Sequence, residues 1–319
     1  MTTQSRSTPW RPLAALSLPQ TVTWGIALAF AAALISGFSV WVNSYAMKEV
    51  RDPTVFTTAK NAIVGLALVA FLLRPGAELP RLPRSGRSRA MLVALGVVGG
   101  SIPFVLFFEG LSRSGPGNAA FIQKTLFIWV AILAVPLLKE RVGRWQLLGF
   151  GMLLAAQLVI GRPSSWNPGD GEWMVLAATG LWTVETVVAR KLLPEVPATL
   201  AATARMMLGG ALLLAYVAFR GKLHILTGLD AEQWRWVIWT SAILLVYVVT
   251  WYSALQRAPA TAVTSILAVA APITAALATW SGKPAPSGEQ VAGYAVLAAA
   301  AVVLAAGARG ASRESAAAT

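Results

Sequence analysis

The chain has 319 residues, of which 56% are apolar and only 12% are charged, and its formal net charge is +13. Charged residues make up about a quarter of an ordinary soluble domain, so this composition argues against a soluble protein. The absence of cysteine excludes a disulfide framework and a thiolate metal site. The basic residues lie between apolar runs of roughly 17–25 residues, the length that crosses a bilayer. We therefore expect a membrane protein whose basic loops contact lipid headgroups, with no nucleic-acid partner.

The apolar runs predict ten membrane-spanning helices. Residues 1–20 are polar and interrupted by prolines, which indicates a cytoplasmic tail. Helix is the expected conformation of each span, because backbone polar groups in hydrocarbon must form hydrogen bonds within their own segment. In chain order, the expected spans are residues 24–45, 53–73, 90–111, 117–138, 145–160, 172–189, 198–219, 234–255, 260–280 and 290–307, followed by a second cytoplasmic tail at 309–319.

The sequence repeats itself with an offset of 144 residues. This offset aligns Leu111 with Leu255 and Gly149 with Gly293. One register over both halves predicts a duplicated unit of five helices, covering residues 21–163 and 164–308. Because five is an odd number, the second copy is expected to be inverted in the membrane. Inverted repeats are typical of secondary transporters, which expose one site to each side in turn.

The basic residues predict the orientation of the chain. Of the 26 lysines and arginines, fifteen fall in segments on the side of the amino terminus, eight fall on the opposite side, and three fall within spans. Cytoplasmic loops carry the excess of basic residues in membrane proteins. We therefore expect both termini in the cytoplasm.

Five ionisable side chains fall within the expected spans: Lys60, Glu109, Lys124, Glu185 and Arg205. An unpaired charge in hydrocarbon is unfavourable, so each is expected to face a partner or a cavity. Estimates of depth from the helical rise predict two pairs, Glu109 with Lys124 and Glu185 with Arg205. Both could be salt bridges that only pin helical hairpins. A role in a cavity is favoured for Glu109 and Lys124.

Aromatic residues gather near the ends of the expected spans. Most of the 13 tryptophans fit an interfacial belt, but Trp182 and Tyr247 lie deeper. An aromatic-lined cavity with a few polar anchors suits an amphipathic metabolite of amino-acid size. The predicted substrate-binding residues are Trp41, Asn43, Lys60, Phe107, Phe108, Glu109, Gln123, Lys124, Trp182, Glu185, Tyr247, Trp251 and Tyr252.

No motif predicts catalysis, a metal site or a cofactor. His224 is the single histidine, and without cysteine or a nearby pair of carboxylates it is a poor metal ligand. There is no phosphate-binding loop or nucleophile elbow, so we expect neither ATP-driven transport nor an enzyme. Two other classes stay open. A lipid-processing membrane enzyme would place acidic or histidine clusters near a membrane face, and a non-transporting sensor would need no polar residues along a central seam.

Several motifs resemble a known family. Residues 137–160 contain a Glu-Arg pair followed by Gln146 and Gly149, and residues 287–304 repeat the Gln-x-x-Gly pattern. Pro53 is followed seven residues later by Lys60. Together these features resemble the ten-helix EamA-type branch of the drug/metabolite transporter superfamily. The resemblance implies a secondary transporter of the bacterial inner membrane, with a cavity formed by helices from both repeats.

Within this superfamily, the chain is most similar to the bacterial aromatic amino acid exporters. That similarity implies export of aromatic and other neutral amino acids, with multidrug efflux and transport of sugars or nucleotide-sugars as alternatives. Lys60 stands where the family more often has arginine, so a single point charge replaces a bidentate grip on a carboxylate. The expected partners are an amino acid-sized substrate and membrane lipids, and we expect a monomer.

Overall fold

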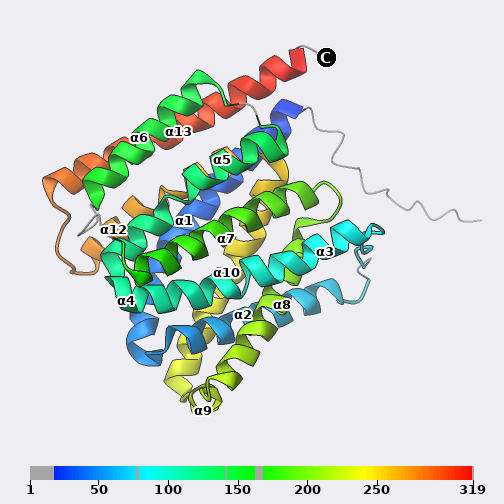
Figure 1. Ribbon diagram of the computed structural model, residues 1–319, viewed down its shortest axis with the longest axis vertical. Coiled ribbons are helices and arrows are strands. Elements are labelled where there is room, and N and C mark those ends of the chain that lie inside the picture. Colours follow the sequence, from blue (N-terminus) through cyan, green and yellow to red (C-terminus); the bar gives the residue numbers. More distant parts are fainter. Residues whose placement is uncertain (1–17, 77–78, 141, 162–167, 318–319) are drawn as a thin grey trace, which may run out of the picture.

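The computed structural model describes residues 18–76, 79–140, 142–161 and 168–317, and within these ranges every regular element is a helix (Figure 1). Within the described part of the chain, seven helical segments are long and apolar enough to cross a membrane. They are Thr21–Val50, Pro53–Leu72, Gly86–Leu138, Ala198–Phe219, Ala231–Arg257, Ala260–Trp280 and Gly288–Gly310. The segment Gly86–Leu138 contains 53 residues, more than twice the length of one span. The protein therefore has the architecture of a multi-pass membrane protein.

The helices of the first half agree with the predicted spans at most positions. They are α1 (Leu18–Val50), α2 (Pro53–Leu72), α3 (Gly86–Ala94), the π-helix η2 (Leu95–Gly99), α4 (Ile102–Lys124), α5 (Leu126–Leu138) and α6 (Arg144–Ile160). The predicted third span is not one continuous helix, because η2 interrupts it. Between the predicted spans 90–111 and 117–138 the structure has a sharp kink inside α4, where Gly115 has a φ of 78°. Only glycine adopts that conformation readily.

The second half contains α7 (Asp170–Leu192), α8 (Ala198–Phe219), the short α9 (Leu223–Thr227), α10 (Ala231–Arg257), α11 (Ala260–Leu267), α12 (Ala270–Trp280) and α13 (Gly288–Ala317). The short helix α9 was not predicted. Parts of both predicted tails are helical, because residues 18–20 begin α1 and residues 309–317 continue α13. Alanine-rich sequence favours helix even beyond hydrocarbon. The rest of the two predicted tails lies outside the described residues.

Four pairs of helices make the most extensive contacts, and each pair joins the two halves of the chain. They are α4 with α7, α1 with α10, α6 with α13, and α2 with α8. The α6–α13 pair forms the upper edge of the molecule in Figure 1. The two halves are therefore interleaved, and the separate clusters of buried apolar side chains each contain residues of both halves.

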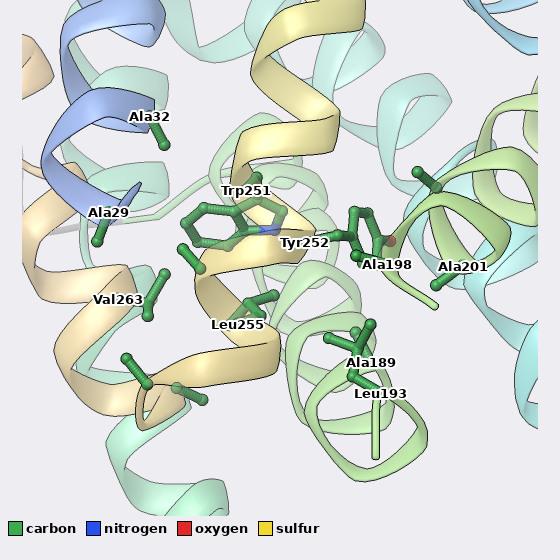
Figure 2. Close-up of a cluster of buried hydrophobic side chains, with 14 of the residues drawn as sticks. Ala29, Ala32, Ala189, Leu193, Ala198, Ala201, Trp251, Tyr252, Leu255 and Val263 are labelled. Carbon is green, nitrogen blue, oxygen red and sulfur yellow. The ribbon is translucent and has the colours of Figure 1, made fainter. Parts of the chain in front are cut away.

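The main apolar core lies between α1, α7, α8, α10 and α11. Two consecutive aromatic residues of α10 contribute to it from opposite sides of that helix, as Figure 2 shows. Trp251 points toward Ala29 and Ala32 of α1, whereas Tyr252 points toward α8. Both side chains are buried.

A polar contact ties the first half to the second outside the spans. Asp52 caps the amino terminus of α2 by accepting hydrogen bonds from the backbone amides of Thr54 and Val55, each at 3.0 Å. Its other oxygen accepts a hydrogen bond from Lys222, between α8 and α9, at 2.7 Å. Partial burial alone would raise the pKa of Asp52, but Lys222 and the two amides together hold it below its usual value of 3.8.

This shift predicts a pH-dependent contribution to stability. A carboxyl whose pKa is lower in the folded state stabilises the protein above its unfolded pKa, and the contribution is lost as pH falls through the folded value. We expect Asp52→Asn to lower stability at neutral pH by about 1 kcal/mol or less, because the pair is partly exposed. The difference in melting temperature should shrink below about pH 4. Asp230→Asn is the control, because Asp230 caps α10 through Gln233 without a lysine. A difference that is equally large at low pH would contradict the prediction.

Candidate functional site

The predicted ion pair between Glu185 and Arg205 is present and buried. The Nε atom of Arg205 on α8 lies 3.4 Å from Oε1 of Glu185 on α7, and their side chains are 13% and 5% exposed. The hydroxyl of Tyr252 on α10 donates a hydrogen bond to the same carboxylate oxygen at 2.5 Å. Three helices of the second half therefore meet at one charged group, and the carboxylate compensates the guanidinium.

This cluster also contacts the first half. The carbonyl of Gly99, the last residue of η2, accepts hydrogen bonds from Nη2 of Arg205 at 3.0 Å and from the indole Nε1 of Trp182 at 3.3 Å. The next carbonyl, that of Gly100, accepts a hydrogen bond from Asn61 of α2 at 3.3 Å. We call Glu185, Arg205, Tyr252, Trp182 and the Gly99 carbonyl the central cluster.

Lys60 lies in a different environment. It is 6% exposed, and its ammonium donates a hydrogen bond to the Oδ1 atom of Asn43 on α1 at 2.9 Å. The ammonium also lies 4.7 Å from the centre of the Phe56 ring. Among the described residues, no carboxylate lies within ion-pair distance of Lys60. A buried ammonium in contact with an amide and an aromatic ring can donate hydrogen bonds to the carboxylate of a ligand.

The predicted pairing of Glu109 with Lys124 is wrong. Glu109 pairs instead with Arg113 on the same helix at 3.5 Å and with Arg220 at the end of α8 at 3.4 Å. The Glu109 side chain is 33% exposed, so it lies near the surface of the protein and not in the core. Lys124 ends α4, where cations interact favourably with the helix dipole. The depth estimate failed because it compared only neighbouring helices, whereas α8 is distant in sequence.

The predicted aromatic residues form three separate groups. Trp182 packs against Phe104 and Phe107, with ring centroids 5.4 and 5.6 Å apart, and Phe107 packs against Phe108. Tyr247 and Trp251 stack on each other along α10, 6.3 Å apart. The first group contains Trp182 of the central cluster, and the second lies on α10, the helix that also carries Tyr252.

The third group lies elsewhere. Trp41 contacts Tyr45 and Trp280, and its indole nitrogen donates a hydrogen bond to Ser281. This arrangement fits an interfacial position for Trp41. Gln123, another predicted anchor, is exposed. Among the thirteen predicted residues, the structure joins Asn43 to Lys60 and Tyr252 to Glu185. It also connects Trp182 to Glu185 through the Gly99 carbonyl and Arg205. That these residues bind a substrate stays a prediction.

Several polar residues with structural contacts, Arg205 among them, were absent from the predicted site. Asn61 follows Lys60 directly and contacts the interrupted third span. Glu140 accepts hydrogen bonds from the backbone amides of Ala260 and Thr261 at 2.6 and 3.1 Å, which caps the start of α11. Glu140 belongs to the Glu-Arg motif in residues 137–160, so that motif is the sequence signal for a bridge between the halves.

Comparison with known proteins supplies a family for these features. A model of the EamA-like transporter family matches residues 23–162 and again residues 170–306. The chain is similar to the chloroplastic WAT1-related protein At3g02690 of Arabidopsis thaliana, with 31% identity over 57% of this chain and 46% of that protein. It is also similar to the uncharacterized transporter sll0355 of Synechocystis sp., with 26% identity over 63% of this chain and 64% of the other.

A third relative is the uncharacterized transporter YyaM of Bacillus subtilis, with 24% identity over 63% of this chain and 69% of the other. The chain thus spans about half of the first relative and about two thirds of the other two. A solved crystal structure of a protein superposes with a TM-score of 0.72, covering 90% of this chain and 98% of that one. At 19% identity, this likeness shows the fold alone.

Proposed function

The chain belongs to the EamA-like transporter family of membrane transporters of metabolites, and we propose that it exports neutral amino acids, aromatic ones foremost, across the bacterial inner membrane. The observation that carries this proposal is Lys60, a buried ammonium without a carboxylate partner among the described residues. An amino acid offers the carboxylate that Lys60 lacks. The rings around Trp182 offer an apolar, stackable surface for its side chain.

We also propose that the chain consists of two inverted five-helix repeats, at residues 21–163 and 164–308, with short tails at residues 1–20 and 309–319. The offset of 144 residues supports this, because it relates the break between α4 and α5 at Thr125 to the break between α11 and α12 at Val269. It also relates the kink at Gly115 to Pro259, which precedes α11. The two family matches fall on the two proposed repeats.

The pattern of helix contacts supports the same proposal. Exchanging the two halves converts the pair α4–α7 into the pair α10–α1, and it converts α2–α8 and α6–α13 into themselves. Such a two-fold relation gives two equivalent arrangements of the halves, one open to each side of the membrane. Alternating access follows from that equivalence.

The function is tested by uptake into liposomes that contain the purified protein. We expect labelled Phe, Trp and Tyr to be transported first, Met more slowly, and glutamate and sugars poorly, because stacking adds about 0.5–1.5 kcal/mol beyond area burial. Running the assay with and without a pH gradient tests proton coupling. Transport of nucleotide-sugars or lipophilic cations without any amino acid would refute the proposed substrate while leaving the family membership unchanged.

The proposed orientation is tested with fused reporters. We expect a reporter that is active only in the cytoplasm to be active after Thr319 and inactive after Trp166, because fifteen basic residues against eight favour cytoplasmic termini. Both fusion points lie outside the described residues. The reverse pattern of activity would refute the orientation and, with it, the assignment of export.

A further inference from the structure

The interruption of the third span has a chemical cause. In an α-helix, the carbonyl of residue i accepts a hydrogen bond from the amide of residue i+4. For Gly99 that residue is Pro103, which has no N–H. The chain accordingly leaves the helical path after η2 and begins α4 at Ile102, with Pro103 in the first turn, where the missing N–H is tolerated. The Gly99 carbonyl is therefore left without its regular donor in a segment that crosses hydrocarbon. A carbonyl without a hydrogen bond is strongly unfavourable there.

Two side chains of the second half supply the missing donors. Arg205 and Trp182 both donate to the Gly99 carbonyl, at 3.0 and 3.3 Å. Arg205 is able to do so while it neutralises Glu185, because its guanidinium carries five N–H donors in a rigid fork. A lysine has a single charged nitrogen and cannot reproduce this fork.

The absence of side chains on Gly99 and Gly100 permits the contact. A Cβ atom on Gly99 would lie 2.3 Å from Cγ of Glu185, and one on Gly100 would lie 2.4 Å from the carbonyl oxygen of Arg205. Both distances are shorter than any tolerated contact. The two glycines therefore allow the backbone of the interrupted span to lie close to α7 and α8.

The same two donors contact the first turn after the interruption. Trp182 meets the Phe104 ring edge-on, with centroids 5.4 Å apart at 77°, and the Arg205 guanidinium lies 5.9 Å from the centre of that ring. Phe107 lies one turn further along α4 and also contacts Trp182. The direction in which α4 leaves the interruption thus decides where these rings lie.

We propose that Arg205 is a positioning residue for transport. Arg205 donates a hydrogen bond to the Gly99 carbonyl, which has no backbone donor because residue 103 is proline. This bond fixes the interrupted third span against the second half and sets the direction of α4. That direction holds Phe104, Phe107 and Phe108 against Trp182. The proposal rests on the proposed function in one respect, namely that this aromatic group contacts the side chain of the substrate.

The test uses two substitutions that keep the charge balance of the core. Arg205→Lys retains a cation beside Glu185 but cannot serve both partners. We expect its KM for labelled Phe in proteoliposomes to rise about tenfold, the effect of losing one hydrogen bond to a charged group. Its KM for Met should change less, because Met does not stack on the rings. Arg190→Lys is the matched control, since Arg190 donates to a different backbone carbonyl, that of Gln256.

Pro103→Ala distinguishes positioning from simple stabilisation. The alanine restores an N–H at residue 103, so the Gly99 carbonyl gains a donor within its own helix and α4 can straighten. We expect purified Pro103→Ala to melt no lower than the wild type, and yet to transport Phe about tenfold more slowly per folded molecule, as after a comparable misplacement of binding groups. Pro136→Ala, inside α5, is its control.

The outcomes separate the two proposals. If the wild type transports aromatic amino acids but Arg205→Lys changes only the melting temperature and Pro103→Ala transports normally, Arg205 is not a positioning residue. If the wild type transports no amino acid, the proposed function fails. The positioning role is then judged from the change in KM for whichever substrate the wild type moves, and an unchanged KM in Arg205→Lys overturns it.

Discussion

Replacing Lys60 with methionine is expected to make the protein more stable and to remove most of its transport activity. Methionine matches the length of the lysine stem without a charge, and replacing buried charges by apolar groups often stabilises a protein by about 1–4 kcal/mol. Lys60 is 6% exposed, and among the described residues Asn43 is its only hydrogen-bond partner, so the protein itself loses little stabilisation. In Lys60→Met a substrate carboxylate loses its counter-ion. A hydrogen bond to a charged group contributes about 1.5–3 kcal/mol to the binding free energy.

Loss of this hydrogen bond to the substrate corresponds to a rise in KM of roughly 10- to 100-fold. The KM is measured from the uptake of labelled Phe per folded molecule. Lys60→Arg keeps the charge and should retain more transport than Lys60→Met. Lys191→Met serves as the matched control, because Lys191 is exposed at the end of α7. An unchanged KM in Lys60→Met, together with higher stability, would mean that Lys60 does not bind the substrate.

Removing Glu185 is expected to cause the largest loss of stability of any single substitution considered for this protein. Glu185→Ala leaves the Arg205 guanidinium buried without a counter-ion and leaves the Tyr252 hydroxyl without its acceptor. Breaking a buried ion pair from one side costs about 3–5 kcal/mol. We expect low expression and a melting temperature lower by many degrees in detergent.

Glu109→Ala is the comparison for this result. Glu109 also has two arginine partners, but its side chain is 33% exposed. Ion pairs at that exposure contribute about 0–1 kcal/mol. The double variant Glu185→Leu with Arg205→Met should recover part of the lost stability, because no uncompensated charge is left and Trp182 still donates to Gly99. Equal losses in Glu185→Ala and Glu109→Ala would contradict the view that the central cluster is a buried ion pair.

The sequence by itself predicted the bounds of several apolar helices. The predicted span at residues 198–219 coincides with α8, and the span at 53–73 differs from α2 by one residue. These boundaries are local, because transfer of a segment from water to hydrocarbon depends on its own side chains, and Asp52 and Pro53 mark the start of α2 wherever that helix packs. The Glu185–Arg205 pair could also be predicted from the sequence, because the two residues lie on neighbouring helices of one hairpin.

The tertiary structure alone decided how the polar groups are shared between distant helices. Arg220 lies 111 residues from Glu109, and no estimate within one hairpin could include it. The same holds for the carbonyl of Gly99, whose donors Trp182 and Arg205 lie 83 and 106 residues away. Pro103 has no N–H, so the Gly99 carbonyl lacks its regular backbone donor. Only the packing of α7 and α8 against the interrupted span could determine which side chains replace it, because that choice depends on how closely two backbones approach at Gly99 and Gly100.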